Sequence, residues 1–316
     1  MPDNECLLEV NHLNKDFPVK KQRLHALSDV SLTVSRGEIL GILGESGCGK
    51  STLATILSGS QAATSGQIRL KGLDYTRLRG GALRNFRRNI QMVFQDPLSS
   101  FSPRMQIGVY VAEPRRNYDH ISKEEAMKEA GDLLEQVGLP REFGRRYPHE
   151  LSGGQLQRVA IARAIAIRPE LLICDEATGA LDVSTQAKIA RLLVDMVEEK
   201  RIGCIFIGHD PAFVRSVTQR IAVMYLGRLV EVLDSESLAD KCLHPYTKAL
   251  LDSIFDIYCD QSKDIKLLAG EPPSPLEIHE GCAFSGRCAF CKERCRKERP
   301  ELREIEPGHQ VACHYV

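Results

Sequence analysis

A short glycine-rich segment constrains the fold of this chain more than any other feature. Gly44-Glu45-Ser46-Gly47-Cys48-Gly49-Lys50-Ser51 fits the pattern G-x-x-x-x-G-K-[ST] of a phosphate-binding loop without a mismatch. An apolar run at residues 39–43 precedes it, and a helix-forming run at residues 52–57 follows it. The sequence therefore predicts a strand, a phosphate-binding loop and a helix, in that order.

The residue types in the loop indicate how it would hold a phosphate. Glycines let backbone N–H groups curl around an anion, and the following helix N-terminus adds partial positive charge. Lys50 would reach the β- and γ-phosphates, and the Ser51 hydroxyl would ligate Mg²⁺. The residues that we expect to contact the nucleotide here are Gly44, Ser46, Gly47, Cys48, Gly49, Lys50, Ser51 and Thr52.

Strand-like runs alternate with helical patterns as far as about residue 235, which predicts an α/β fold. Apolar runs at 39–43, 90–94, 171–174 and 204–207 read as buried strands, and a polar residue follows each within two positions. An α/β sheet presents its chemistry at these carboxyl ends. Residues 97–168 turn helical, which indicates a helical insertion in the sheet domain.

Charge and hydropathy exclude some classes of protein. Lys+Arg and Asp+Glu are both 42, so the net charge is zero and the basic field typical of a nucleic-acid binder is absent. The apolar runs are well short of the ~20 residues that span a bilayer. The N-terminus lacks the pattern of a signal peptide. We therefore expect a soluble, cytosolic chain whose membrane partners, if any, are separate.

Two further stretches carry polar chemistry. Asp175 and Glu176 end a buried strand; in a phosphate-loop ATPase the first carboxylate holds Mg²⁺ and the second polarises the attacking water. Ser152-Gly153-Gly154-Gln155 opens a helix, with Ser152 as N-cap; its exposed amides would form a second anion site, and on local composition alone an ordinary capped helix is the alternative.

The order of these motifs resembles the nucleotide-binding subunit of an ABC transporter. Ser152–Gln155 falls between the phosphate loop and Asp175-Glu176, as the family's signature does. Gln95 matches the Q-loop glutamine, Ala180-Leu181-Asp182 the D-loop and His209 the switch histidine. Phe17 matches the aromatic residue that stacks on adenine. The resemblance covers residues 7 to about 235.

The resemblance implies an α/β phosphate-loop ATPase core, a helical subdomain and a two-chain ATP site. One chain would hold ATP and Mg²⁺ with its phosphate loop, Asp175 and Gln95. The signature residues Ser152, Gly153, Gly154 and Gln155 of the other chain would cap the γ-phosphate, and Asp182 of the D-loop would also contact the nucleotide. Glu176 would orient the attacking water, and His209 would sense the γ-phosphate. The catalytic set is therefore Glu176, His209 and Gln95.

Five of the eleven cysteines gather in the C-terminal tail, at positions 282, 288, 291, 295 and 313. In a cytosolic protein such a cluster indicates a metal site before it indicates disulfides. Four thiolates suit an iron–sulfur cluster or a structural Zn²⁺, and free thiols are the third alternative.

The tail resembles the C-terminal extension of peptide-importer ATPases, the oligopeptide, dipeptide and nickel group. The matching stretches are residues 244–251, 281–284 and 311–313, and residues 270–276 are more similar to the second ATPase of those systems than to the first. Members can carry a [4Fe–4S] site, whose ligands by position would be Cys282, Cys288, Cys295 and Cys313. Cys291 is an equally good ligand by spacing, so the fourth ligand stays open.

This resemblance implies an ATP-hydrolysing subunit of an ABC importer, most simply for di- or oligopeptides. Residues 1–235 would form the ATPase domain, with the helical subdomain at 97–168, and residues 236–316 a cysteine-rich extension. The implied partners are a second ATPase subunit, more often a different chain than a copy, two transmembrane permeases and an extracytoplasmic solute-binding protein. The chain would sit peripherally on the cytoplasmic face of the membrane. The alternative is a soluble ABC ATPase of DNA repair or translation.

Overall fold

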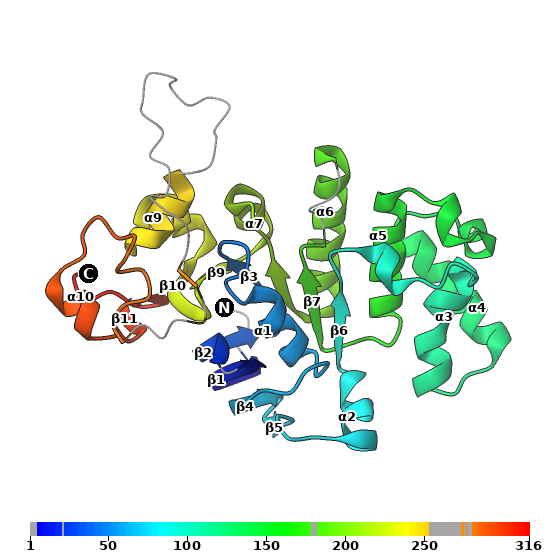
Figure 1. Cartoon of the computed structure of the whole chain (residues 1–316). Coiled ribbons are helices and arrows are strands. Elements are labelled where there is room, and N and C mark those ends of the chain that lie inside the picture. The colour runs from blue at the N-terminus through cyan, green and yellow to red at the C-terminus, as the bar shows by residue number, and fades with distance from the viewer. Residues whose placement is uncertain (1–4, 21, 178–181, 253–272, 275, 277–279) are drawn as a thin grey trace.

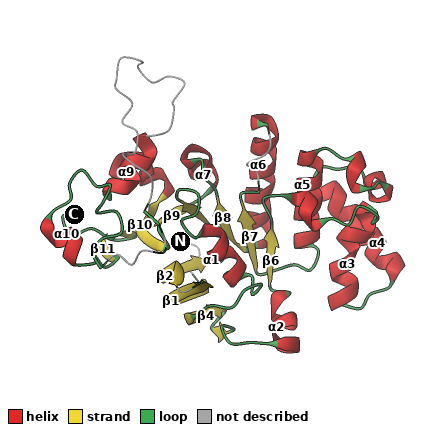
Figure 2. Ribbon diagram, in the orientation of Figure 1, coloured by secondary structure: helices red, strands yellow, loops and turns green. Residues whose placement is uncertain are grey.

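The computed structural model of the chain describes residues 5–20, 22–177, 182–252, 273–274, 276 and 280–316. Its strands form two sheets, with helices α3, α4 and α5 at one end and the C-terminal elements at the other (Figures 1 and 2). In the described residues, no helix combines the length and apolarity needed to cross a membrane.

The larger sheet has eight strands in the order β11-β12-β10-β9-β3-β8-β7-β6. The strands from β9 to β6 in this order run parallel to one another, and β10, β12 and β11 continue the sheet antiparallel. In chain order the strands are β3 (Ile39–Leu43), β6 (Ile90–Val93), β7 (Leu171–Asp175), β8 (Gly203–Ile207), β9 (Arg220–Tyr225), β10 (Arg228–Asp234), β11 (Arg303–Glu306) and β12 (His309–Val311).

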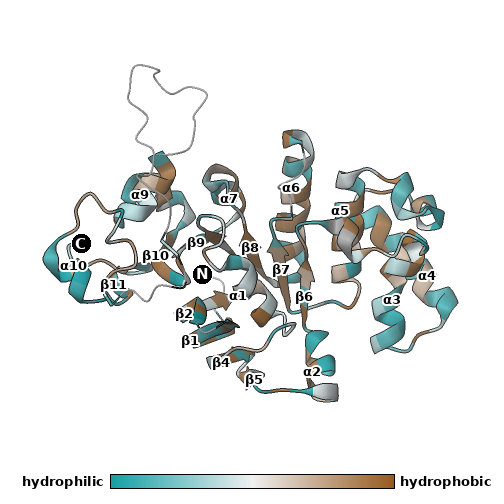
Figure 3. Ribbon diagram, viewed as in Figure 1, coloured by the Kyte–Doolittle hydropathy of each residue, from teal (hydrophilic) through white to brown (hydrophobic). Residues whose placement is uncertain are grey.

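The four strands predicted from apolar runs are confirmed. Every residue of β3, β7 and β8 is buried, as continuous apolar runs require when helices cover both faces of a parallel sheet. Figure 3 shows the hydrophobic colouring of these strands. Because β3, β6, β7 and β8 are parallel, the residues that follow them meet at one edge of the sheet.

The smaller sheet is antiparallel and has the order β2-β1-β4-β5. Helix α1 (Lys50–Leu57) follows the phosphate loop, and its apolar residues share one buried cluster with both sheets, for example Leu8, Ile42 and Leu53. The phosphate loop is therefore held between two packed sheets. The strands are β1 (Cys6–Val19), β2 (Gln22–Ser35), β4 (Ser65–Leu70) and β5 (Leu73–Asp74).

Between residues 97 and 165 the secondary-structure elements are all helices, as predicted. Helix α4 spans residues 123–136, and Gly138 follows it with a φ of +73°. The α-helices of the structure beyond α1 are α2 (Gly80–Arg87), α3 (Ile107–Tyr118), α4 (Lys123–Gln136), α5 (Gly153–Ile165), α6 (Val183–Lys200), α7 (Pro211–Val217), α8 (Leu238–Lys241), α9 (Pro245–Asp252) and α10 (Glu293–Lys297).

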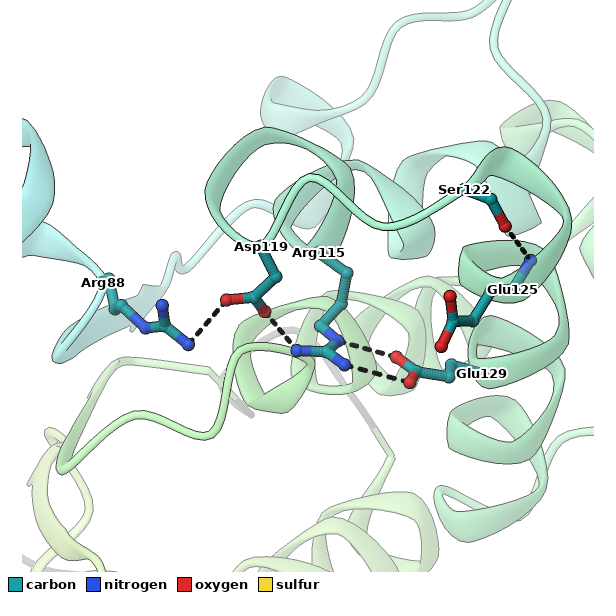
Figure 4. A network of polar contacts seen from close by, with 6 residues as sticks. All are labelled: Arg88, Arg115, Asp119, Ser122, Glu125 and Glu129. Carbon is teal, nitrogen blue, oxygen red and sulfur yellow. Dashed lines mark hydrogen bonds and ion pairs between the residues drawn. The ribbon is translucent and has the colours of Figure 1, made fainter.

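An ion-pair network ties these helices to the sheet (Figure 4). Arg88, which lies between α2 and β6, is 2.8 Å from a carboxylate oxygen of Asp119, just after α3. Arg115 pairs with Asp119 and donates two hydrogen bonds, of 2.7 and 3.0 Å, to Glu129 of α4. The Arg115 guanidinium holds the pKa of Glu129 below its usual value. The network joins α3 and α4 to the segment that leads into β6.

The C-terminal residues complete the larger sheet. Strand β12 pairs with β10, placing Val311 opposite Glu231. The Glu231 side chain is fully buried. Its oxygens accept hydrogen bonds from the backbone N–H groups of Leu243 and His244, and Oε1 lies 2.8 Å from Nε2 of His309. The prolines of residues 271–275 predict a stiff linker, and this segment lies largely outside the described residues.

Candidate functional site

A cavity of about 290 Å³ lies over the phosphate loop. It brings together three features predicted separately from the sequence: Phe17 from β1, most of the loop, and the pair Gln95 and Glu176. The loop residues that line it are Ser46, Gly47, Gly49, Lys50, Ser51 and Thr52. Gly44 and Cys48 do not line it, and Cys48 is buried.

Two glycines let the loop approach its neighbours. A Cβ on Gly44 would lie 2.2 Å from the carbonyl oxygen of Met224, and one on Gly49, where φ is +107°, would lie 2.5 Å from that of Ala26. Any side chain there would push the loop away from β2 and β9. Lys50 is 5% exposed, and its Nζ donates hydrogen bonds to the carbonyl oxygens of Gly44 and Glu45, at 2.7 and 2.9 Å.

Ser51 and Asp175 place two oxygens side by side. The Ser51 hydroxyl donates a 3.3 Å hydrogen bond to Oδ1 of Asp175, at the end of β7. Burial raises the pKa of Asp175, and the hydrogen bond from Ser51 acts in the opposite direction. A hydroxyl and a carboxylate are ligands that Mg²⁺ prefers, so this pair fits the predicted magnesium site.

The catalytic candidates meet at the same sheet edge. Nε2 of Gln95 donates a 2.6 Å hydrogen bond to Oε2 of Glu176, and the same oxygen lies 3.9 Å from Nδ1 of His209. Glu176 has a left-handed backbone with φ of +45°, and its N–H donates to the Ile207 carbonyl at the end of β8. This hydrogen bond to the neighbouring strand thus fixes the position of Glu176 just after β7.

Other predicted residues lie away from this cavity. Ser152 is the N-cap of α5, where its side chain and that of Gln155 each bond the other's backbone N–H, and neither they nor Gly153 and Gly154 line the cavity. Asp182 caps α6, and hydrogen bonds from Ser184 and Thr185 lower its pKa to about 2. Ala180 and Leu181 lie outside the described residues.

The cavity also has walls that the motifs did not predict. Leu24, His25 and Ala26 of β2 and the turn residues Leu226 and Gly227 complete its lining. Gly227 lies in the turn between β9 and β10. These residues belong to no motif, so only the sheet pairing reveals them.

A second cavity, of about 300 Å³, lies in the C-terminal tail, and we call it the cysteine pocket. Cys282, Cys288, Cys295 and Cys313 all line it, whereas Cys291 does not. The Cys282 N–H donates a 2.7 Å hydrogen bond to the carbonyl of Cys295. A Cβ on Gly281 would lie 2.2 Å from that carbonyl oxygen, so a glycine is needed for the two cysteine segments to approach.

The four thiols influence one another. The pKa of Cys282 is raised to about 11, mainly by burial, with smaller contributions from Cys295, Cys288 and Cys313. Burial also raises the pKa of Cys288, with added contributions from Cys291, Cys295 and Cys313. Within the part of the chain that the structure describes, no group of three or more His, Cys, Asp or Glu side chains is arranged to hold a metal ion.

Comparison with protein families gives two matches along the chain. Residues 27–179 match the family described as ABC transporter. Residues 230–295 match the family described as oligopeptide/dipeptide transporter, C-terminal region. The first match includes the phosphate loop and Glu176, and the second includes Cys282, Cys288 and Cys295.

Comparison with individual proteins agrees. The chain is 42% identical to the oligopeptide transport ATP-binding protein OppF of Haemophilus influenzae, over 98% of this chain and 97% of that protein. It is 42% identical to the di/tripeptide transport ATP-binding protein DppF of Pseudomonas aeruginosa, over 99% and 98%. Among solved structures, the dimeric ATP-binding cassette MJ0796 bound to ADP and Pi has a TM-score of 0.68 and 31% identity, over 72% of this chain and 99% of that one.

Proposed function

This chain belongs to the ATP-binding proteins of oligopeptide and dipeptide ABC transporters, and from that premise we propose how its residues do the work of the family. It is an ATPase that powers a peptide importer. The observation that carries the residue assignments is the single cavity that unites Phe17, the phosphate loop, Gln95 and Glu176.

The phosphate loop binds ATP, with Phe17 stacking on the adenine. Lys50 exchanges its bonds to the loop carbonyls of Gly44 and Glu45 for the β- and γ-phosphates. Ser51, Asp175 and Gln95 would hold Mg²⁺, which would neutralise phosphate charge when bound. Glu176 orients the attacking water, and His209 contacts the γ-phosphate. Catalysis by these groups is mainly positioning and electrostatic stabilisation.

The ATP site is completed by a second chain. Ser152, Gly153 and Gly154 lie at the start of α5, away from the cavity, so they are free to cap the γ-phosphate bound by a partner. The dimeric state of the related cassette MJ0796 supports this arrangement. We propose that the partner is a different ATPase chain, and that Asp182 contacts the nucleotide.

A peptide importer also contains membrane permeases and a solute-binding protein. The ATPase is membrane-associated, and we propose that it docks peripherally on the cytoplasmic face of two permeases. Residues 97–168, which the ion pairs of Figure 4 join to the sheet, would transmit the movement of Gln95 to them.

Residues 1–235 act in this proposal as the ATPase domain and residues 236–316 as the cysteine-rich extension. We propose that Cys282, Cys288, Cys295 and Cys313 bind a [4Fe–4S] cluster, because a Cys₄ set is what such a cluster requires and these four thiols share one cavity. A bound cluster would cross-link the tail. Zn²⁺ is the alternative, and Cys291 is not a ligand.

Reconstitution tests the function as a whole. The chain would be purified with its permeases, partner ATPase and binding protein, and placed in lipid vesicles. ATP hydrolysis and uptake of labelled di- or oligopeptide should both require the peptide-loaded binding protein. A rate of ATP hydrolysis that depends neither on the peptide nor on the other subunits would contradict the proposal.

A further inference from the structure

Glu45, the second residue of the phosphate loop, is held by an arginine from the C-terminal tail. Nη1 and Nη2 of Arg287 donate hydrogen bonds of 2.8 and 3.0 Å to the two carboxylate oxygens of Glu45. The side chains are 6% and 24% exposed. A two-pronged contact between a guanidinium and a carboxylate fixes orientation as well as distance, and burial shields it from salt.

The backbone of Glu45 is held as well. Its N–H donates a 2.9 Å hydrogen bond to Oη of Tyr246 in α9, and its carbonyl accepts one of the same length from Lys50. The residue gripped by Arg287 is therefore the residue whose carbonyl positions the phosphate-binding lysine. A shift of Glu45 would move that carbonyl and so change the position of the Lys50 side chain before the nucleotide binds.

The other end of this contact lies in the cysteine pocket. Arg287 directly precedes Cys288, and its N–H donates to the carbonyl of Phe284, which lines the pocket. The ring of Phe284 packs against Tyr246 and Tyr225, at centroid distances of 5.4 and 5.3 Å. Two contacts thus connect the pocket to Glu45: the ion pair with Arg287 and the hydrogen bond with the hydroxyl of Tyr246.

We propose that Arg287 is a positioning residue for the phosphate loop, and that filling the cysteine pocket with its metal group strengthens ATP binding by holding Arg287 against Glu45. The second half of this statement rests on the proposed cluster. Coupling between two sites is reciprocal, so bound ATP should also slow the loss of metal.

The first experiment isolates Arg287. Purified full-length chain is titrated with a fluorescent ATP analogue and Mg²⁺, and its metal and sulfide content is measured. Arg287→Gln should weaken binding of the analogue about tenfold. Arg287→Lys keeps the charge but loses the two-pronged hydrogen bonding, so its affinity should lie between those of Arg287→Gln and the unsubstituted chain. Arg294→Gln is the control, since Arg294 pairs with Glu298 on the exposed surface of the same tail, and should bind normally.

A double-mutant cycle separates positioning from general damage to the fold. If Arg287 acts through Glu45, then Arg287→Gln combined with Glu45→Gln should weaken binding little more than either change alone. Additive losses, or binding by Arg287→Gln within about twofold of the unsubstituted chain, would overturn the positioning role.

The second experiment tests the pocket. Cys313→Ser should lose the metal group and weaken the analogue, but it should add no further weakening in the Arg287→Gln background. If the unsubstituted chain holds metal and Cys313→Ser loses it with unchanged nucleotide affinity, the coupling is wrong while the cluster stands. If the unsubstituted chain, purified anaerobically, holds no metal, then both the cluster and its coupling fail, and the Arg287 role is judged by the first experiment alone.

Discussion

Gln95 and Glu176 are joined by a 2.6 Å hydrogen bond from the amide Nε2 to the carboxylate Oε2. The bond spans two neighbouring strands, since Gln95 follows β6 and Glu176 follows β7. Helical structure begins at Pro97, two residues after Gln95. A movement of the helical segment that displaces Gln95 would therefore break this hydrogen bond. The Glu176 oxygen would then be available to orient the attacking water.

Glu176→Gln should abolish turnover and preserve ATP binding. The amide keeps the shape of the side chain but cannot polarise water, so hydrolysis by the assembled transporter should fall by about 10²–10⁴-fold. Glu170→Gln is a matched control, because Glu170 precedes the other end of β7 and pairs with Arg36 and Lys71. ATPase rates and nucleotide titrations check both; full activity in Glu176→Gln would contradict the assignment.

Ser152→Ala should separate hydrolysis from binding. Ser152 and Ser122 are both N-caps whose side chains accept from the third N–H of the helix, so either substitution to alanine should cost about 1 kcal/mol of stability. Only Ser152→Ala should slow hydrolysis in the assembled transporter, since only it would face a partner's ATP. Nucleotide affinity of the isolated chain should be unchanged in both. Equal hydrolysis rates in the two variants would argue against the shared site.

Serine substitutions of the cysteines should divide into two groups. Cys282→Ser, Cys288→Ser, Cys295→Ser and Cys313→Ser should each lose most of the iron and acid-labile sulfide from an expected content of about four iron atoms per chain. Cys291→Ser should keep both, because Cys291 does not line the cysteine pocket. Elemental and sulfide analysis of anaerobically purified protein decides. Stoichiometric zinc without sulfide would reject the cluster in favour of a zinc site.

Glu129→Gln should destabilise the chain at neutral pH more than in acid. The Arg115 contact lowers the pKa of Glu129 in the folded state, so its contribution is present above the unfolded value near 4.5 and is lost as pH falls below it. We expect a loss of about 1 kcal/mol at pH 7, allowing for partial exposure, and a smaller loss at pH 4. Urea unfolding at both pH values measures it. Glu125→Gln on the same helix, outside the ion pairs of Figure 4, is the control and should change little at either pH.

The parts of the site that could be predicted are those carried by strand ends. Gln95, Asp175 and His209 each follow an apolar run, and parallel strands bring such residues to one sheet edge whatever the rest of the fold does. The glycine pattern of the phosphate loop likewise has a local cause, because the backbone must curl around an anion.

What could not be predicted depends on distant pairing. Arg287 and Glu45 are 242 positions apart, and no periodicity or spacing links them. Cys291 is as good a ligand by spacing as its neighbours, and only the folded structure shows that it does not line the cysteine pocket. The place of β12 between β10 and β11 was also hidden, since a strand of three residues leaves almost no pattern.

The pairing of β12 with β10 has a consequence for biosynthesis. The ribosome synthesises Glu231 long before His309. Until β12 is made, the Glu231 carboxylate lacks His309 and the edge of β10 is unpaired. An open edge of this kind invites pairing with other chains. Translation that stops early would therefore yield a chain prone to aggregation, and the nucleotide-binding half reaches its final sheet only after the cysteine segment has also been made.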